Sequence, residues 1–426
     1  MSMIEPKRAT ASDIESPYAW ARMLVCLALM TIGGSGTYAV SVMLTRIQAE
    51  FGASRADVSL AYTLSMIGFG IGGVLMGRLA DRRGVWVPAM LGAVFLCAGY
   101  VVAGSATSLW QFSLAQGVLI GLLGTSASFA PLIADTSRWF YRRRGIALAI
   151  CMTGNYLAGT IWAPVLQHYA ETVGWRQTYV WMGLFCLVAM LPLTLVLRRR
   201  PPDAGAPSGA LAASEPATTA MAAGSLRPHG MSPNTLQVLL GVAGVACCVA
   251  MSMPQVHIVA YCGDLGFGAA RGAEMLSLML AMGIVSRIVS GWISDHIGGL
   301  RTLLLGSVLQ GVALLMFLFT DGLASLYVVA AMFGLFQGGI VPSYALIVRE
   351  NFPPREAGTR VGTVLMCTLY GMALGGWMSG AIFDATGSYR AAFLNGTAWN
   401  LVNVVIVLFL ISRTRRGRFA PVPTRA

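Results

Sequence analysis

The sequence predicts an all-α membrane protein with about twelve transmembrane helices arranged as two similar halves. Of its 426 residues, 56% are hydrophobic and only 11% are charged, whereas an ordinary soluble domain has roughly 25% charged residues. Apolar runs of roughly 20 residues, the length of helix that crosses the hydrocarbon core of a bilayer, recur through nearly the whole chain. The runs form two sets of six, which predicts a duplicated chain that is embedded in lipid.

The predicted helices are the apolar runs that charged or turn residues separate. The first six runs lie at residues 20–44, 57–79, 86–105, 109–135, 145–169 and 175–197. The second six lie at residues 235–261, 272–294, 301–320, 323–348, 358–382 and 390–412. The first run is too long for the apolar region of a signal peptide, so we expect it to remain as the first transmembrane helix.

A segment rich in Pro, Ala, Ser and Gly separates the two sets of runs. It covers residues 198–234 and has too few bulky apolar residues to bury a core, which predicts a flexible cytoplasmic linker. The predicted domains are then an N-terminal six-helix bundle at residues 20–197 and a C-terminal six-helix bundle at residues 235–412. Cytoplasmic tails at residues 1–19 and 413–426 flank them.

Basic residues predict the orientation, because cytoplasmic loops carry the excess of Lys and Arg. With both termini in the cytoplasm, 23 of the 29 Lys and Arg residues fall on that side. Five fall on the other side, namely Arg46, Arg55, Arg176, Arg271 and Arg390. The sequence thus predicts a multi-pass protein of the inner (plasma) membrane. The net charge of +12 is interpreted as a topology signal and not as a nucleic-acid-binding surface.

An internal repeat relates the two halves with an offset of about 213 residues. The matching landmarks are Gly77–Asp81 with Gly291–Asp295, Arg142 and Gly145 with Arg355 and Gly358, and Gly174 and Gly183 with Gly387 and Gly396. Because each half has an even number of spans, the two copies have the same orientation and are related by an axis along the membrane normal.

The sequence gives no sign of an enzyme. It contains no Walker-type Gly-x-x-x-x-Gly-Lys loop, no metal-ligand cluster and no paired carboxylates. The eight cysteines lie within or at the edge of apolar runs, without disulfide or metal-ligand spacing, and are interpreted as packing residues. We therefore expect no catalytic residue, metal or cofactor, and any transport would be driven by gradients.

The loop between the second and third helices carries the most specific motif. It reads Gly77-Arg78-Leu79-Ala80-Asp81-Arg82-Arg83-Gly84, and a degraded copy runs from Gly291 to Gly298 between the eighth and ninth helices. In these two loops the chain resembles the major facilitator superfamily, whose signature loop lies at the same places. The resemblance implies the major facilitator fold, with two pseudo-symmetric six-helix bundles, and a monomer.

The motif also has a physical interpretation of its own. Gly77 permits close packing of helices, and Asp81 can meet the partial positive charge at a neighbouring helix N-terminus. Arg142 and the two arginines after it offer ionic partners nearby. The resemblance implies that such contacts hold a cytoplasmic gate closed, and the candidate gating residues are Gly77, Asp81, Arg82, Arg142, Gly291 and Asp295. The alternative is a turn that only fixes the topology.

Further motifs resemble the monocarboxylate transporters and their oxalate/formate antiporter relatives. They are the run from Arg138 to Ala149 that leads to Gly154 in the fifth helix, Gly387-Ser388-Tyr389-Arg390 with Phe393 before the twelfth helix, and Ser286-Arg287 in the eighth helix. The chain also departs from these relatives. Gly283 stands where the animal members carry an aspartate, and Lys7 is the only lysine, so the lysines of helices 1 and 11 in the two groups are absent.

Arg287 is the one strongly basic residue well inside a predicted span. An intramembrane charge is costly and marks a candidate functional site. Gly283, Ser290 and Gly291 share its helix face, which is a small-residue surface that can line a cavity. No Asp or Glu lies mid-span to pair with it, so we predict that its planar guanidinium binds a substrate carboxylate. The alternative is that Arg287 snorkels into cytoplasmic water as an anchor.

The other candidate site residues are polar side chains within spans. His257, in the outer part of the seventh helix, is a candidate for proton coupling because imidazole titrates near physiological pH. The alternative is a hydrogen-bonded packing residue. The candidate substrate-binding donors are Tyr38, Asn155, Tyr156, Tyr344 and Tyr370. Tyrosines are also typical of interfacial belts, and a mid-span Asn can serve only to join helices.

Together these features predict a secondary active transporter whose halves rock about a central site for a small, monocarboxylate-like organic anion. Proton symport would neutralise the moving charge and anion exchange would balance it, and the sequence leaves both open. Two alternatives stand beside this prediction. One is an efflux carrier for apolar compounds, which the many methionines favour, and the other is a non-transporting membrane sensor on the same fold.

Overall fold

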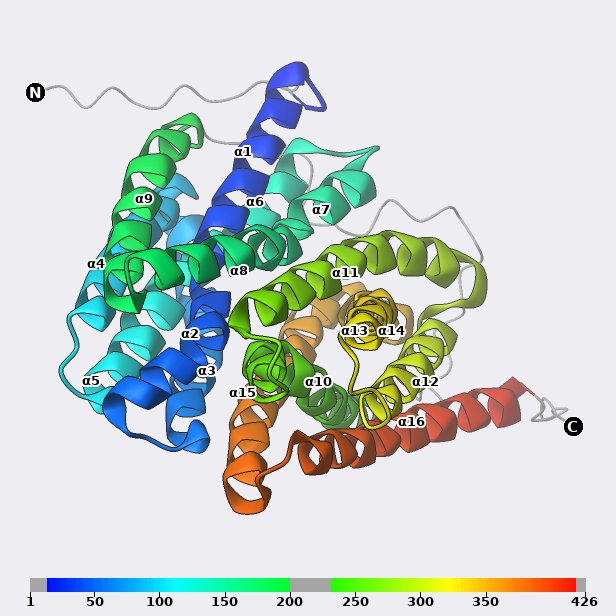
Figure 1. The fold of residues 1–426 in the computed structure, drawn as a ribbon. Helices are drawn as coiled ribbons and strands as arrows, with labels where there is room; N and C mark the ends of the chain where they lie inside the picture. The colour runs from blue at the N-terminus through cyan, green and yellow to red at the C-terminus, as the bar shows by residue number, and fades with distance from the viewer. Residues whose placement is uncertain (1–13, 200–230, 419–426) are drawn as a thin grey trace, which may run out of the picture.

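The structure, a computed structural model, describes residues 14–199 and 231–418. Within these residues the chain forms helices and no strands, and twelve helical segments are long and apolar enough to cross a membrane (Figure 1). The predicted all-α membrane fold with twelve spans is confirmed. Parts of the predicted tails and linker, at residues 1–13, 200–230 and 419–426, lie outside the described residues.

The first six spans form the N-terminal half, coloured from blue to green in Figure 1. Spans one to three are α1 (Pro17–Gly33) continued by α2 (Ser35–Phe51), α3 (Arg55–Arg83) and α4 (Trp86–Gly104). Span four joins α5 (Leu109–Leu114), a π-helical segment (Ala115–Gly124), a 3₁₀ turn (Thr125–Ser128) and α6 (Ala130–Trp139). Spans five and six are α7 (Arg144–Met152) continued by α8 (Gly154–Thr172), and α9 (Trp175–Val196).

The second six spans form the C-terminal half, coloured from green to red. They are α10 (Pro233–Asp264), α11 (Ala269–Ile297), α12 (Gly299–Met316), α13 (Leu323–Gln337) continued by α14 (Ile340–Asn351), α15 (Pro354–Thr386) and α16 (Tyr389–Arg418). We call the end of the molecule where α1 begins and α16 ends the terminal end. The opposite end, where α2 ends and α3 begins, is the loop end.

Spans four and ten are both interrupted, at positions that the internal repeat relates. Span four is irregular between Gly124 and Ala130, and span ten breaks at Gly338 and Gly339. The offset of about 213 residues places Thr125 on Gly338. The helix interruptions of spans four and ten therefore lie at equivalent positions of the internal repeat.

The two copies of the signature loop end on glycines whose backbone conformation other residues rarely adopt. Gly84 has φ 87° and ψ 155°, and Gly298 has φ 82° and ψ 163°. This region of backbone space is almost confined to glycine, because a β-carbon would clash there. Glycine thus recurs at the ends of α3 and α11 because it lets the chain turn directly into α4 and α12.

Glycines also bring α13 directly against α11. A β-carbon on Gly334 would overlap the backbone of Met279, and one on Gly338 would overlap the backbone of Gly283. The two helix backbones therefore touch without intervening side chains. Small residues at such contacts are typical of helices that associate in lipid, where packing replaces the hydrophobic effect.

The two halves meet along three pairs of helices near the centre of the molecule. Helix α3 packs against α15, α8 against α11, and α2 against α10 (Figure 1). The contacts include hydrogen bonds from the Thr63 hydroxyl to the Ala373 carbonyl (2.8 Å) and from the Ser277 hydroxyl to the Thr160 carbonyl (2.5 Å). These helices therefore position whatever lies between the halves.

A buried ion pair ties three spans of the N-terminal half together at the terminal end. Arg22 of α1 and Asp135 of α6 are 1% and 4% exposed and share two hydrogen bonds, of 2.8 and 3.0 Å. The guanidinium also donates to the carbonyls of Val196 and Leu197 and lies 4.7 Å from the ring centre of Trp139. A buried charge of this kind stays stable only while its partners are in place.

We expect Arg22→Met to destabilise the folded protein by about 3–5 kcal/mol, because Asp135 is left buried and charged without its partner. Adding Asp135→Leu should restore much of the lost stability. Thermal unfolding of the detergent-purified variants, followed by tryptophan fluorescence, measures both effects. A single variant as stable as the parent would contradict the assignment.

Candidate functional site

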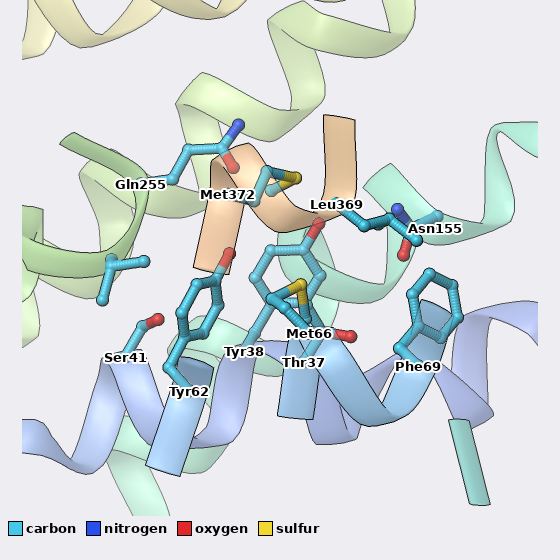
Figure 2. Close-up of a pocket in the computed structure, with 11 residues that line it drawn as sticks. Thr37, Tyr38, Ser41, Tyr62, Met66, Phe69, Asn155, Gln255, Leu369 and Met372 are labelled. Atoms are coloured by element: carbon cyan, nitrogen blue, oxygen red, sulfur yellow. The ribbon is translucent and has the colours of Figure 1, made fainter. Parts of the chain in front are cut away.

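A cavity lies between the two halves, near the middle of most of the spans that form it. Its empty volume is about 420 Å³, and Figure 2 shows the residues around it. The N-terminal half contributes Thr37, Tyr38, Ser41, Tyr62, Met66, Phe69 and Asn155, and the C-terminal half contributes Gln255, Val256, Leu369 and Met372. Because both halves form the walls, any movement of one half against the other changes the cavity.

Two of the predicted donors line this cavity. Tyr38 comes from α2, and Asn155 comes from the first turn of α8, just after the helix is interrupted at Thr153. Figure 2 shows the hydroxyl of Tyr38 and the amide of Asn155 among the lining groups. The sequence had singled out both residues as polar groups within apolar spans.

Four further polar residues of the wall were not predicted, namely Thr37, Ser41, Tyr62 and Gln255. Tyr62 comes from α3, and Gln255 comes from α10, where its amide nitrogen donates to the side-chain oxygen of Gln337 (3.1 Å). A signal for Gln255 was present, because an amide side chain within an apolar span favours the interior of a bundle. Tyr62 carried no such signal, since a tyrosine near the start of a span also fits an interfacial belt.

Arg287 of α11 reaches across to the N-terminal half. Its Nη1 donates to the carbonyl of Met152 at the end of α7 (3.0 Å), and its Nε lies 3.5 Å from the carbonyl of Gly338 as a long hydrogen bond. Its guanidinium carbon lies 4.5 Å from the ring centre of Tyr156. The side chain thus lies in the contact between the halves, against Tyr156, which follows the cavity residue Asn155 in the chain, and is not itself among the residues of the wall.

The guanidinium of Arg287 has no carboxylate partner within the described ranges 14–199 and 231–418. The ion pairs there involve other arginines, and the hydrogen-bond acceptors of Arg287 are neutral carbonyls. The ring of Tyr156 adds a favourable cation–π contact but no negative charge. The positive charge beside the cavity therefore remains without a counter-charge.

The other predicted tyrosines lie elsewhere. Tyr156, which is 6% exposed, packs against Arg287 and does not reach the cavity wall. Tyr344 is fully buried within the C-terminal half, where its hydroxyl donates to Asn403 (2.9 Å). Tyr370 of α15 is 42% exposed and does not line the cavity. The structure therefore does not bring Tyr344 and Tyr370 to the candidate site.

A polar cluster joins the halves at the loop end, and we call it the lock. It consists of Arg55 of α3, Asp264 of α10, Asp384 of α15 and Tyr389 of α16. The two terminal nitrogens of Arg55 donate to the two carboxylate oxygens of Asp264, at 2.5 and 2.6 Å, and one of them also donates to the Tyr389 hydroxyl at 2.7 Å. The backbone N–H groups of Arg55 and Ala56 donate to Asp384 at 3.0 and 2.7 Å.

The lock was missed by sequence reasoning. Arg55 was counted as a topology signal on the non-cytoplasmic side, and Asp264 and Asp384 were not among the candidate residues. The side chain of Arg55 is only 8% exposed. Its partner Asp264 lies 209 positions away in the chain. No local sequence pattern predicts the pair of Arg55 and Asp264, because it forms only when the two halves dock.

His257 lies directly behind the lock and is fully buried. Its Nδ1 is 2.9 Å from the hydroxyl of Tyr389, and its Nε2 is 2.8 Å from the carbonyl of Gly376 and 3.4 Å from the hydroxyl of Ser59. Ser59 belongs to the N-terminal half, so His257 also contacts both halves. His257 is thus shielded from water in this conformation.

The predicted gating residues with charges lie exposed at the terminal end. Asp81 pairs with Arg138 of α6 (2.8 Å), and not with Arg142 or the two arginines after it. Arg82, Arg142 and Asp295 are exposed. The Asp81 pair lies within the N-terminal half, so it does not join the two halves.

The predicted gating glycines do not serve close helix packing in this conformation. A β-carbon on Gly77 or Gly291 would meet no atom within 4 Å. Nearby, Arg144 of one half and Arg349 of the other carry like charges that interact unfavourably. The conformation is therefore closed by the lock at the loop end, whereas these charges oppose contact of the halves at the terminal end.

No group of three or more His, Cys, Asp or Glu side chains that could hold a metal ion occurs in the part of the chain that the structure describes. The eight cysteines are free thiols, and six of them are buried. The arrangement thus combines a guanidinium without a carboxylate partner between the halves and a buried, hydrogen-bonded imidazole behind the lock.

Comparisons with known proteins agree with the fold. The chain matches the family model of the Major Facilitator Superfamily over residues 24–359 and 275–426. It is 29% identical to monocarboxylate transporter 13 of Rattus norvegicus over 361 residues, which are 83% of this chain and 78% of that protein. It is 24% identical to monocarboxylate transporter 12 of Mus musculus over 443 residues, covering 97% of this chain and 90% of that protein.

A solved structure shows the same fold at low sequence identity. It is the crystal structure of a bacterial homolog to the human lysosomal transporter Spinster in an inward-facing and occupied conformation. The TM-score is 0.70 at 16% identity, with 96% of this chain and 100% of that chain covered. From the family match, the twelve spans and the shared architecture, the chain belongs to the major facilitator superfamily and is a membrane transporter, not an enzyme.

Proposed function

We propose that this protein is a secondary active transporter that moves a small organic anion of the monocarboxylate class. The two halves would expose a central site alternately to either side of the membrane, by proton symport or by exchange for a second anion. Its partners would be the anion, the coupling proton or counter-anion, and the lipid bilayer, with the protein acting as a monomer. The two relatives that are named monocarboxylate transporters support the substrate class.

The observation that carries this proposal is the uncompensated guanidinium of Arg287 between the halves. Its hydrogen-bond partners are the neutral carbonyls of Met152 and Gly338. A charge held within the membrane-spanning part is costly unless something neutralises it. A substrate carboxylate would supply the counter-charge and fits the planar guanidinium with two parallel hydrogen bonds.

The adjacent cavity supplies the remaining surface for a small acid. Its walls come from both halves and combine polar groups with apolar side chains. Arg287 contacts Tyr156, and the preceding residue, Asn155, lines the cavity, so a molecule held by its carboxylate at Arg287 would extend from Tyr156 towards the cavity. The side chains of Met66 and Leu369 would cover a short carbon skeleton.

The candidate gating residues would act in the opposite conformation. If the loop end opened, the terminal end would have to close, and the two signature loops are the segments that would meet there. We assign this role to Gly77, Asp81, Arg82, Arg142, Gly291 and Asp295. The open space around Gly77 and Gly291 supports the assignment, because it leaves room for a partner to pack there after the movement.

We further propose that His257 takes part in proton coupling. Its position behind the lock supports this role, because it contacts both halves through Ser59 and through the Tyr389–Arg55 bond. We also propose that the terminal end faces the cytoplasm of a cell bounded by the inner (plasma) membrane. The support is the concentration of arginines at that end, following the positive-inside rule.

The apolar part of the cavity favours a second candidate function, efflux of apolar compounds. The residues that contribute this surface are Met66, Phe69, Val256, Leu369 and Met372. In an efflux carrier of this kind, Arg287 would only join the halves through the carbonyl of Met152. The two functions predict opposite roles for the side chain of Arg287, which allows a direct test.

We expect Arg287→Ala to abolish uptake of lactate- or oxalate-like acids into liposomes that contain the purified protein. Arg287→Lys should retain weak uptake, because an ammonium keeps the charge but loses the bidentate geometry. Each variant is assayed with and without a proton gradient, which also separates symport from exchange. Binding of an acid without any flux in the parent protein would instead indicate a sensor.

Full activity of Arg287→Ala would remove the site assignment, and export of an apolar dye by that variant would favour the efflux function. An alanine variant that is unfolded is recognised by its thermal unfolding profile. In that case, the lysine variant decides the question, because equal activity of Lys and Arg contradicts a bidentate contact.

Tyr38→Phe and Tyr370→Phe form a matched pair, because each removes one hydroxyl group. We expect Tyr38→Phe to raise the KM for the anion about tenfold, since a hydrogen bond to a charged group contributes about 1.5 kcal/mol or more. Tyr370→Phe, outside the cavity, should leave KM unchanged. Initial uptake rates over a range of acid concentrations measure both, and equal effects of the two substitutions would argue against the cavity as the binding site.

A further inference from the structure

The hydrogen bonds of His257 define the protonation of its ring while the lock is closed. The carbonyl of Gly376 can only accept, so the Nε2 atom, 2.8 Å away, carries a proton. The hydroxyl of Tyr389 accepts from Arg55 at 2.7 Å and so can donate its own proton to Nδ1 at 2.9 Å. The hydrogen bonds therefore run in one direction, from Arg55 through Tyr389 and His257 to Gly376, and the imidazole is neutral.

A second proton on His257 conflicts with this chain. It can bind only at Nδ1, where it points at the Tyr389 oxygen that already accepts from Arg55. The hydroxyl proton of Tyr389 would then lose its acceptor. In addition, the imidazolium and the guanidinium of Arg55 would be separated by a single hydroxyl group, and like charges in a buried site repel strongly. A charged His257 and a closed lock therefore disfavour each other.

The charged groups that face His257 show what the opening of the lock would change. They are Asp264 of α10, Asp384 of α15 and Arg55 of α3, and the phenols of Tyr261 and Tyr389 complete the surroundings. Both acids belong to the C-terminal half, as does His257. The cation belongs to the N-terminal half.

In the closed lock, α3 stabilises both acids, Asp264 through the Arg55 guanidinium and Asp384 through the N–H groups at its N-terminus. The guanidinium binds both oxygens of Asp264 and lies 3.8 Å from the ring centre of Phe383. When the halves part at the loop end, Arg55 leaves with α3. Asp264 and Asp384 then remain on the C-terminal half beside His257 without a positive charge.

We propose that His257 is a proton-binding site whose proton replaces the departing end of α3, with its Arg55, as the positive charge beside Asp264 and Asp384. A proton from water that reaches the parted lock binds Nδ1, and it returns to water when Arg55 re-forms the lock. Protonation and opening of the loop end then favour each other to the same extent, as linkage requires. The inference rests on the proposed function only in that the two halves move alternately. It does not depend on the nature of the substrate.

The test measures the opening of the loop end directly, without any substrate. Spin labels are attached at Val173→Cys and Phe319→Cys, two exposed positions at the loop end of the N-terminal and C-terminal halves. The eight native cysteines are replaced by alanine, and the full-length protein is studied in lipid nanodiscs by double electron–electron resonance. We expect a short label–label distance at about pH 8 and, at about pH 5, a ratio of long to short distances at least about tenfold higher.

Neutral replacements of His257 should remove this pH dependence. His257→Gln and His257→Asn are both prepared so that at least one folded variant is available, and a folded variant shows the short distance at both pH values. His168→Gln is the matched control, because His168 is an exposed histidine of α8 near the same end, and it should respond to pH as the parent does.

Two results would overturn the proposal. One is a parent protein whose label distances do not change between the two pH values. The other is a folded His257 variant that still opens at the lower pH. Neither result depends on anion transport, because the label distances are measured without substrate, so failure of this inference and failure of the proposed substrate class are distinguishable.

Discussion

The structure depends on how charges are accommodated within helices that span a membrane. Three arginine side chains lie between the helices, and the positive charge of each is accommodated differently. Arg22 is neutralised by Asp135 inside one half, and Arg55 is neutralised by Asp264 across the two halves. Arg287 donates only to neutral carbonyl groups. The first contact stabilises a bundle, the second closes one end of the molecule, and the third leaves a positive charge for something else to neutralise.

The fold was predictable because lipid imposes a simple rule on the sequence: a span must be long and apolar. The predicted run at residues 235–261, for example, is helix α10, which extends from Pro233 to Asp264. The interruptions of the spans were not predictable from composition. The break at Gly338 and Gly339 and the irregular segment Thr125–Ser128 consist of small residues, which also occur within the regular spans of this chain, so composition does not distinguish them from helix.

The candidate site was predictable only in part, for reasons that differ from residue to residue. Arg287 stood out because a lone charge in an apolar run has few explanations. Tyr344 and Tyr370 have the same side chain within apolar spans, yet one is buried in a bundle and the other is exposed, because the rotation of each helix is set by its neighbours. Arg55 and Asp264 could not be paired from the sequence, since their contact forms only when two separately folded halves dock.

The contact between α11 and α13 has a mechanical consequence for the transporter. Because the backbones of Gly283 and Gly338 touch, the two helices have no layer of side chains that could absorb a small displacement. Arg287 is also bonded to the carbonyl of Gly338, which is the point where span ten bends. An anion that pulls the guanidinium away from this carbonyl would release a constraint on the bend. Binding of the anion would then change the direction of span ten and not only rotate a side chain.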